Sequence, residues 1–269
     1  MIKVKDCPTP NGTTEKTFFL SAFAADNQLG LTRDPGYTER LAKRDPTLAA
    51  AIGRGDWSVY AGQVFREFSR TTHVMQPFPL PLTWMRCRSL DWGYDAPLSV
   101  HWWAKDSVSG RLYVYRELYQ AGLTDPKQAR KVKDMTLPEE DIVFTFADPS
   151  CWTRRTIDEI EKSTYDVYLS YQVLLTKADN AQSNKLRKCH SVLDLAPDGK
   201  PYVQIFDTCP ALIRTLQGLM TNPQHKDDIL PGQEDHAYDD FAYGLTNYVE
   251  ALPPAPKYTP AKTRSPFTR

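Results

Sequence analysis

The middle of the chain carries two hydrophobic patterns, one with the spacing of strands and one with that of helices. Short apolar runs bounded by turn residues predict strands, and apolar positions recurring three and four residues apart predict helices. The predicted strands are Trp84–Trp92, Leu98–Lys105, Arg111–Tyr119, Ile142–Ala147, Gln172–Thr176 and Tyr202–Phe206. The predicted helices are Asp125–Met135, Arg154–Lys162, Ser183–Leu195, Pro210–Leu219 and His236–Glu250.

The order of these elements predicts an α/β fold of the ribonuclease H-like class. The Gly93–Pro97 turn joins the first two strands as a hairpin, and the third strand extends it into an antiparallel meander. Strands and helices then alternate, which is typical of parallel pairing. We therefore expect a mixed sheet, an antiparallel meander followed by parallel strands, flanked by helices.

The segments on either side lack this pattern. Residues 1–83 are irregular and turn-rich, and Pro77, Pro79 and Pro81 alternate in an extended connector. Residues 252–269 are proline-rich and basic with few core-forming side chains, which predicts a disordered tail. The patterned domain is thus expected to span residues 84–251.

The amino-acid composition narrows the possible classes of protein function only slightly. Among 269 residues there are 33 Lys and Arg and 33 Asp and Glu, so the zero net charge neither supports nor excludes a nucleic-acid partner. The apolar runs are too short to cross a bilayer, and the N-terminus lacks the apolar core of a signal peptide. We therefore expect a soluble intracellular protein with no membrane partner. The five cysteines form no C-x-x-C pair, which argues against a disulfide framework or a zinc site.

Acidic residues occur where predicted elements begin and end. Asp91 closes the first strand, Asp148 directly follows the fourth, and Asp239 and Asp240 lie in the first turn of the last helix. Each one alone is explained by a turn or a helix cap. If the first and fourth strands are parallel neighbours, however, Asp91 and Asp148 share one sheet edge, and the helix adds a third carboxylate. Such a cluster suits two hard divalent cations about 4 Å apart, which can activate water and stabilise the leaving oxygen of a phosphodiester.

Helical periodicity does not choose between the two helix acids. Asp240 flanks the apolar stripe of the last helix, whereas Asp239 points nearly opposite. His236 lies one turn before both, which suits a metal ligand, a supporting group behind a metal ligand, or an ordinary first-turn residue.

Three motifs, in this order, resemble the nuclease domain of the large terminase subunit of tailed bacteriophages: "SLDWGYDAP", "FADPS" and "HAYDDFAYGL". The segment "YVQIFDTCPALIRTL" is also similar to that family, which carries a comparable strand and Cys-Pro helix start before the last acidic motif. The resemblance covers roughly residues 84–250. "GDWSVYAGQVF" resembles the segment that joins the ATPase of the family to its nuclease.

The resemblance implies an endonuclease that cuts double-stranded viral DNA during genome packaging with Mg²⁺ or Mn²⁺, held as two ions. It implies that Asp91 bridges both ions and that Asp148 is the ligand after the later strand. Asp239 matches the helix ligand because it stands four residues before Tyr243, as in the Asp-x-x-x-Tyr pattern of the family. Asp240 then becomes an auxiliary acid and His236 a supporting group.

One departure from the family concerns ATP. Large terminases begin with an ATPase, but no G-x-x-x-x-G-K-[ST] phosphate-binding loop occurs here. We therefore expect no ATPase activity in this chain, and residues 1–83 are interpreted as the remnant of the ATPase–nuclease linker. The resemblance also implies a separate ATPase domain, a small terminase subunit and a portal as partners, in the cytoplasm of the bacterial host.

Basic residues near the predicted site are candidate contacts to DNA phosphates. They are Arg154, Arg155, Lys177, Lys185, Arg187 and Lys188. Two other interpretations remain open at this stage. One is a Holliday-junction resolvase or transposase-like nuclease of the same fold, and the other is a non-catalytic module that binds DNA or a portal and whose acids are structural.

Overall fold

The computed structural model describes residues 2–8, 14–20, 27–37, 39–40, 62–157, 160–179, 181–225 and 228–248. It divides into two compact units. The first comprises Met1–Arg70 and Arg214–Glu234, and the second comprises Thr71–Ile213 and Asp235–Arg269. The predicted tail, 252–269, lies outside the described residues. The predicted boundaries near residues 83 and 251 stay predictions.

The first unit contains a two-stranded antiparallel sheet of β1 (Ile2–Pro8) and β2 (Thr14–Leu20). The short helix α1 (Gln28–Arg33) begins after Asn27, whose side chain accepts a hydrogen bond from the Gly30 N–H. Farther along the chain, isolated bridges join Gln63 to Met220 and Thr221 to Ile229. Backbone pairing thus ties the two sequence segments of this unit to each other.

The second unit is built on a seven-stranded mixed sheet with the order β10-β7-β4-β5-β6-β11-β3. The strands are β3 (Val74–Met75), β4 (Met85–Asp91), β5 (Leu98–Lys105), β6 (Leu112–Gln120), β7 (Ile142–Ala147), β10 (Thr176–Lys177) and β11 (Val203–Phe206). The β4-β5-β6 meander is antiparallel, whereas β7 pairs parallel to β4, β10 to β7 and β11 to β6. The predicted mixed sheet and its meander are confirmed.

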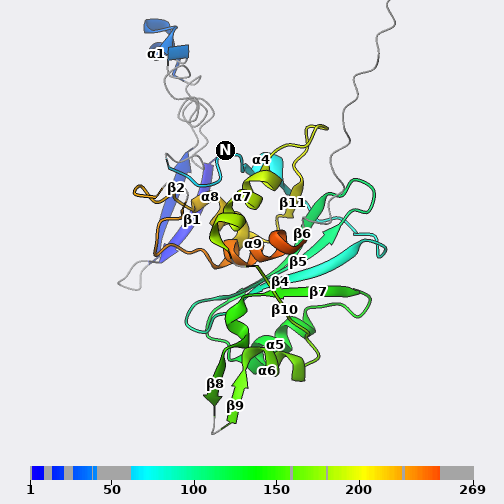
Figure 1. Cartoon of the computed structure of the whole chain (residues 1–269). Helices are drawn as coiled ribbons and strands as arrows, with labels where there is room; N and C mark the ends of the chain where they lie inside the picture. The colour runs from blue at the N-terminus through cyan, green and yellow to red at the C-terminus, as the bar shows by residue number, and fades with distance from the viewer. Residues whose placement is uncertain are drawn as a thin grey trace, which may run out of the picture. The chain divides into compact units, whose positions relative to one another are not determined.

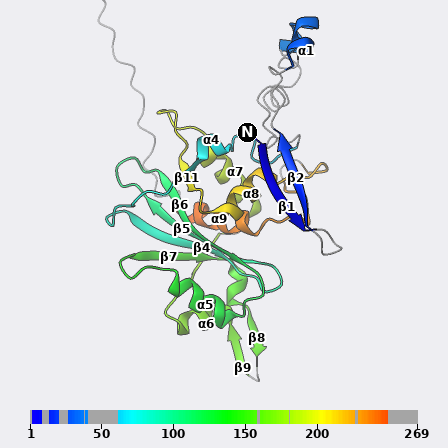
Figure 2. The same cartoon turned by 180° about the vertical axis from the view of Figure 1, so that it is seen from behind.

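Helices cover both faces of this sheet. In Figures 1 and 2, α5 (Asp125–Asp134) and α6 (Thr164–Ser170) lie on one face, and α7 (Gln182–Leu193) and α9 (His236–Tyr248) lie on the other. Two shorter helices complete this list. Helix α4 (Arg70–His73) directly precedes β3, and α8 (Pro210–Gly218) directly follows β11. Within the described part of the chain, no helix is long and apolar enough to span a membrane.

The main hydrophobic core lies on the α5 and α6 side of the sheet. Its buried members come from the central strands and from both helices: Leu90, Leu98, Val100, Trp102, Tyr113, Tyr115, Leu118, Ala129, Val132 and Tyr168. These apolar side chains leave water together, which is the dominant favourable term in folding. The opposite face of the same strands carries the polar groups described below.

A bulge in β6 interrupts the alternation of its side chains between the two faces of the sheet. Trp102 pairs with Arg116 but Trp103 pairs with Val114, so Tyr115 is an extra residue on β6. Tyr113, Tyr115 and Leu118 consequently all join the main core. The same offset aligns Glu117 directly opposite His101 of β5.

The predicted helix over Arg154–Lys162 is wrong. The segment forms an antiparallel hairpin of β8 (Arg154–Ile157) and β9 (Ile160–Ser163). The β-branched residues of "RRTIDEI" favour extended backbone. Ser163 and Asp166 then form a capping box, which starts α6 only after the hairpin. The predicted strand at Gln172–Thr176 is also displaced, because only Thr176 and Lys177 pair with β7.

Helix α9 packs directly against β5. Trp103 of β5 stacks on Phe241 of α9, with ring centroids 5.2 Å apart. A Cβ placed on Gly244 would lie 2.6 Å from the indole ring of Trp103. Only glycine fits at this crossing, and it lets the acidic first turn of α9 approach the end of β4.

Candidate active site

Asp91 and Asp148 lie at the same edge of the sheet. Asp91 is the last residue of β4, and Asp148 follows the last residue of β7. The two strands run parallel with Leu90 opposite Ala147, and the Asp148 N–H donates to the Leu90 carbonyl at 3.2 Å. The expected parallel pairing of the first and fourth strands is therefore present, and it places two carboxylates on neighbouring strand ends.

Asp91 is a nearly buried carboxyl group, 9% exposed. Its Oδ2 lies 3.0 Å from Nδ1 of His236, which belongs to the first turn of α9. Burial raises the pKa of Asp91 to about 7, and the nearby Asp239 carboxylate adds to the rise, while the His236 contact opposes it. The same hydrogen bond raises the pKa of His236. The hydrogen bond thus favours the charged form of each group, but for Asp91 the effect of burial is larger.

Asp148 has two hydrogen-bond donors from different elements. Its Oδ1 accepts from the Ser150 N–H at 2.6 Å, which caps the short 3₁₀ turn η2 (Pro149–Trp152). Its Oδ2 accepts from the Tyr243 hydroxyl of α9 at 2.5 Å. Asp148 is thus a turn former, but it also connects the sheet edge to the helix that carries the third acid.

Asp239 pairs with a buried lysine. Lys185 of α7 is 5% exposed, and its Nζ lies 2.5 Å from Asp239 Oδ1. Burial raises the pKa of Asp239, and Lys185 opposes that rise. The Asp239 side chain keeps 24% of its surface exposed, so solvent still reaches it.

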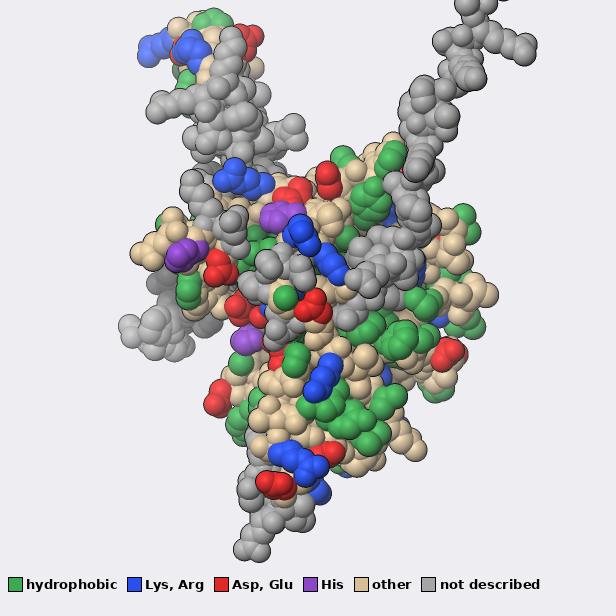
Figure 3. Space-filling model, in the orientation of Figure 1, with side chains coloured by type: hydrophobic (Ala, Val, Ile, Leu, Met, Phe, Trp, Pro, Cys, Tyr) green, Lys and Arg blue, Asp and Glu red, His purple; other side chains and the backbone are tan. Residues whose placement is uncertain are grey.

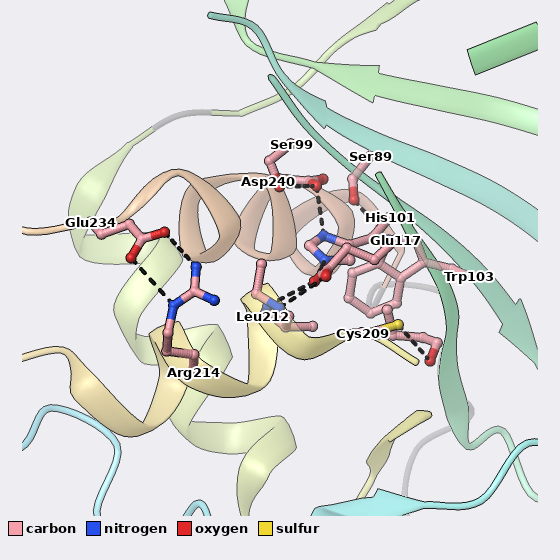
Figure 4. A network of polar contacts seen from close by, with 12 residues as sticks. Ser89, Ser99, His101, Trp103, Glu117, Cys209, Leu212, Arg214, Glu234 and Asp240 are labelled. Atoms are coloured by element: carbon pink, nitrogen blue, oxygen red, sulfur yellow. Dashed lines mark hydrogen bonds and ion pairs between the residues drawn. The ribbon is translucent and has the colours of Figure 1, made fainter. Parts of the chain in front are cut away.

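Asp240 has different surroundings, although it is the next residue. It is fully buried and accepts a hydrogen bond from the Ser99 hydroxyl at 2.9 Å. Its Oδ2 also lies 2.6 Å from His101 Nδ1, an ion-pair contact (Figure 4). Its charge is therefore compensated inside the protein, away from the partners of Asp239.

His101 is the centre of a buried chain of charges. Its Nε2 lies 3.1 Å from Glu117 Oε1 (Figure 4). Glu117 in turn accepts hydrogen bonds from the backbone N–H groups of Ala211 and Leu212, in the first turn of α8. Burial alone would lower the pKa of His101, but Asp240 and Glu117 together raise it to about 9. A protonated His101 thus links α9, β5 and β6 through two carboxylates.

The three acids suit a divalent cation by their chemistry, because carboxylate oxygens are the ligands that Mg²⁺ and Mn²⁺ prefer. The pKa values of Asp91 and Asp239 are raised mainly by burial, so a bound cation would relieve the cost of their charges. Within the described residues, however, no three His, Cys, Asp or Glu side chains converge as a ready metal site. Each acid instead faces a donor of its own: His236, Tyr243 or Lys185.

The basic residues predicted to contact DNA occupy different surroundings. Arg154 on β8 and Arg187 on α7 are exposed, and Arg154 faces Glu161 across the hairpin at 3.6 Å. Lys177 is exposed beside the Trp152 ring, and the half-buried Lys188 donates to the Thr246 carbonyl. Arg155 lies on β8.

Lys185 differs from these residues because it is buried and faces Asp239.

On the face shown in Figure 3, Lys and Arg side chains form several separate groups, one of them near β8 and β9.

The similarity of this chain to known proteins is found in structure and not in sequence comparisons. No protein-family profile matches the chain, and no curated protein sequence matches it. Among solved structures, it is similar to the large terminase nuclease domain of phage P22, with 16% identity, 70% of this chain and 92% of that chain covered, and a TM-score of 0.56.

It is also similar to the large terminase of the thermophilic bacteriophage D6E, with 17% identity, 79% of this chain covered and a TM-score of 0.58. The match covers 52% of the D6E chain, so this chain spans about half its length. These likenesses agree with the resemblance found in the motifs. The chain has the ribonuclease H-like fold of large-terminase nuclease domains.

Proposed function

We propose that this chain is a divalent-metal-dependent endonuclease that cuts double-stranded viral DNA during genome packaging. The observation that carries the proposal is the placement of Asp91 and Asp148 on adjacent strand ends, in a fold shared with a terminase nuclease domain. Helix α9, bound to both acids through His236 and Tyr243, supplies Asp239 nearby.

Asp91, Asp148 and Asp239 are the proposed metal ligands and catalytic acids, and they would together hold two divalent ions. When bound, Mg²⁺ or Mn²⁺ supplies an activated water and neutralises charge on the leaving oxygen. His236 orients Asp91, and the Tyr243 hydroxyl orients Asp148, as partners behind metal ligands commonly do. Because His101 compensates Asp240 internally, we assign Asp240 an anchoring role and choose Asp239 as the helix ligand.

The proposed DNA contacts are to phosphates and carry no base specificity. Exposed Arg154, Lys177 and Arg187 are the first candidates, with Arg155 and Lys188 beside them in the sequence. In the complete packaging system, the proposed partners are an ATPase domain, a small terminase subunit and a portal, in the host cytoplasm. The longer D6E large terminase is consistent with a further domain in such systems.

A second candidate function is a non-catalytic module that binds DNA or a portal. It is favoured by the lack of converged metal ligands among the described residues. Such a module would bind DNA without cutting it, so a cleavage assay separates the two candidates.

The test is digestion of a supercoiled plasmid by the purified chain. With Mn²⁺, we expect nicked and then linear DNA with little sequence preference, and excess EDTA should stop the reaction. Conversion that continues in EDTA would exclude a metal-dependent nuclease. Binding to the plasmid without any conversion in Mn²⁺ or Mg²⁺ would favour the non-catalytic module.

A further inference from the structure

The position of Lys185 follows from the periodicity of α7. Lys185, Cys189 and Val192 are buried at helical spacing, so the lysine lies on the inward stripe of the helix. A buried ammonium needs a close counter-charge, because an unpaired buried ion is strongly destabilising. Asp239 Oδ1, at 2.5 Å, supplies that charge.

Two aromatic rings complete the surroundings of this ammonium. Lys185 Nζ lies 5.2 Å from the Tyr243 ring centroid and 6.0 Å from that of Tyr238. Ring faces attract cations, so both contacts help to hold the ammonium at this position. Tyr243 simultaneously donates its hydroxyl to Asp148, which connects Lys185 to a second acid of the site.

Charge balance gives Lys185 a consequence for metal binding. His101 is the close cationic partner of Asp240 and His236 that of Asp91, whereas Lys185 is the cation in contact with Asp239. A divalent ion that uses Asp239 must either displace the ammonium or share the carboxylate with it, and like charges at contact distance repel strongly in a buried site.

We propose that Lys185 is the resident cation of Asp239 and competes with a divalent cation for that carboxylate. In the metal-free protein it keeps the acid compensated and joins α7 to α9. On metal loading it opposes uptake at Asp239, so the site fills at Asp91 and Asp148 first. This proposal deepens the proposed function and rests on the same metal site.

The first test is calorimetric titration of the whole chain with Mn²⁺ alone, with no DNA present. Lys185→Met keeps most of the length of the unbranched side chain and removes its charge. We expect it to bind Mn²⁺ at least about tenfold more tightly than wild type, since one repulsive unit charge is lost. Lys188→Met is the matched control, because it removes a charge from the same helix but leaves the Lys185–Asp239 pair intact. Its Mn²⁺ affinity should stay within about threefold of wild type. Unchanged or weaker Mn²⁺ binding by Lys185→Met would overturn the proposal.

A second measurement needs no variant and covers the case in which Lys185→Met does not fold. Acetylation of wild-type lysines, followed by mass spectrometry, should modify Lys185 several times faster in saturating Mg²⁺ than in EDTA, while the rate at Lys188 changes little. Equal or slower modification of Lys185 in Mg²⁺ would contradict displacement. Neither measurement reads cleavage. A chain that passes both tests yet cuts no DNA would refute the nuclease function alone, and a chain that cuts DNA but fails both would refute the role of Lys185 alone.

Discussion

Asp91→Asn should abolish DNA cleavage while leaving the metal-free protein as stable as wild type or more stable. Loss of a shared metal ligand is expected to lower the cleavage rate by on the order of a thousandfold or more, comparable to losing a group that acts on the transition state. Asparagine keeps the shape of the side chain but cannot carry the charge. The relevant measurements are plasmid cleavage in Mn²⁺ and thermal unfolding with and without Mn²⁺.

The stability part of this prediction follows from the pKa of Asp91. The folded protein holds this proton more tightly than an unfolded chain, with a pKa of about 7 against 3.8. Metal-free wild type should therefore lose stability as the pH rises from about 4 to about 7, by at most about 4 kcal/mol from this group. At neutral pH, Asp91→Asn should therefore gain stability relative to wild type. Because the variant also loses the charge-assisted contact to His236, part of that gain should be offset, by about 1.5–3 kcal/mol. Asp91→Asn should lack the pH-dependent loss.

Added Mn²⁺ should show whether Asp91 is a metal ligand or only a turn former. A ligand stabilises only the state that binds it, so Asp91→Asn should lose most of the rise in melting temperature that Mn²⁺ gives wild type. Asp95→Asn is the matched control, because Asp95 is exposed in the turn four residues later. A destabilised Asp91→Asn that keeps the full Mn²⁺ response would show that Asp91 only shapes the turn.

His101→Ala should be among the most destabilising single changes in the second unit. It would leave Asp240 fully buried and Glu117 nearly buried without their shared counter-charge. Breaking a buried ion pair by removing one partner costs about 3–5 kcal/mol. Urea unfolding of the variant and of His225→Ala, an exposed histidine, provides the comparison.

The pH dependence of the same network gives a second readout. Because the pKa of His101 is raised to about 9 from 6.5, its contribution to stability is complete below about pH 6.5 and is lost as the pH rises through 9. His101→Gln, which retains hydrogen bonding but no charge, should not show that alkaline loss. A cost below about 1 kcal/mol for His101→Ala, or the same alkaline profile in His101→Gln, would mean that the histidine is not charged in the fold.

The strand ends and their acids could be predicted because the signals were local. Apolar runs ended at Asp91 and Asp148, and the two acids were expected to share a sheet edge if their strands paired in parallel, which they do. The hairpin at β8 and β9 was missed because its charged residues fit a helix equally well, although the capping residues Ser163 and Asp166 marked a later helix start.

The roles of Lys185 and His101 could be recognised only from the tertiary structure. The inward stripe of α7, with Lys185 four residues before Cys189, was visible in the sequence, but the charge of Lys185 suggested a contact to DNA phosphates. Nothing near His101 in the sequence indicated Glu117 or Asp240, because a β6 bulge and the approach of α9 at Gly244 bring them together. Long-range charge pairing of this kind leaves no periodic signal.

The most direct test of the proposed metal site is anomalous X-ray scattering from crystals grown with Mn²⁺. The proposal predicts an anomalous peak about 2.1 Å from carboxylate oxygens of both Asp91 and Asp148, the distance typical of a small hard cation. A second peak should involve Asp239 at higher Mn²⁺ concentration, as Lys185 is displaced. Well-ordered crystals that show no Mn²⁺ at Asp91 and Asp148, or that show it only elsewhere on the chain, would contradict the proposal.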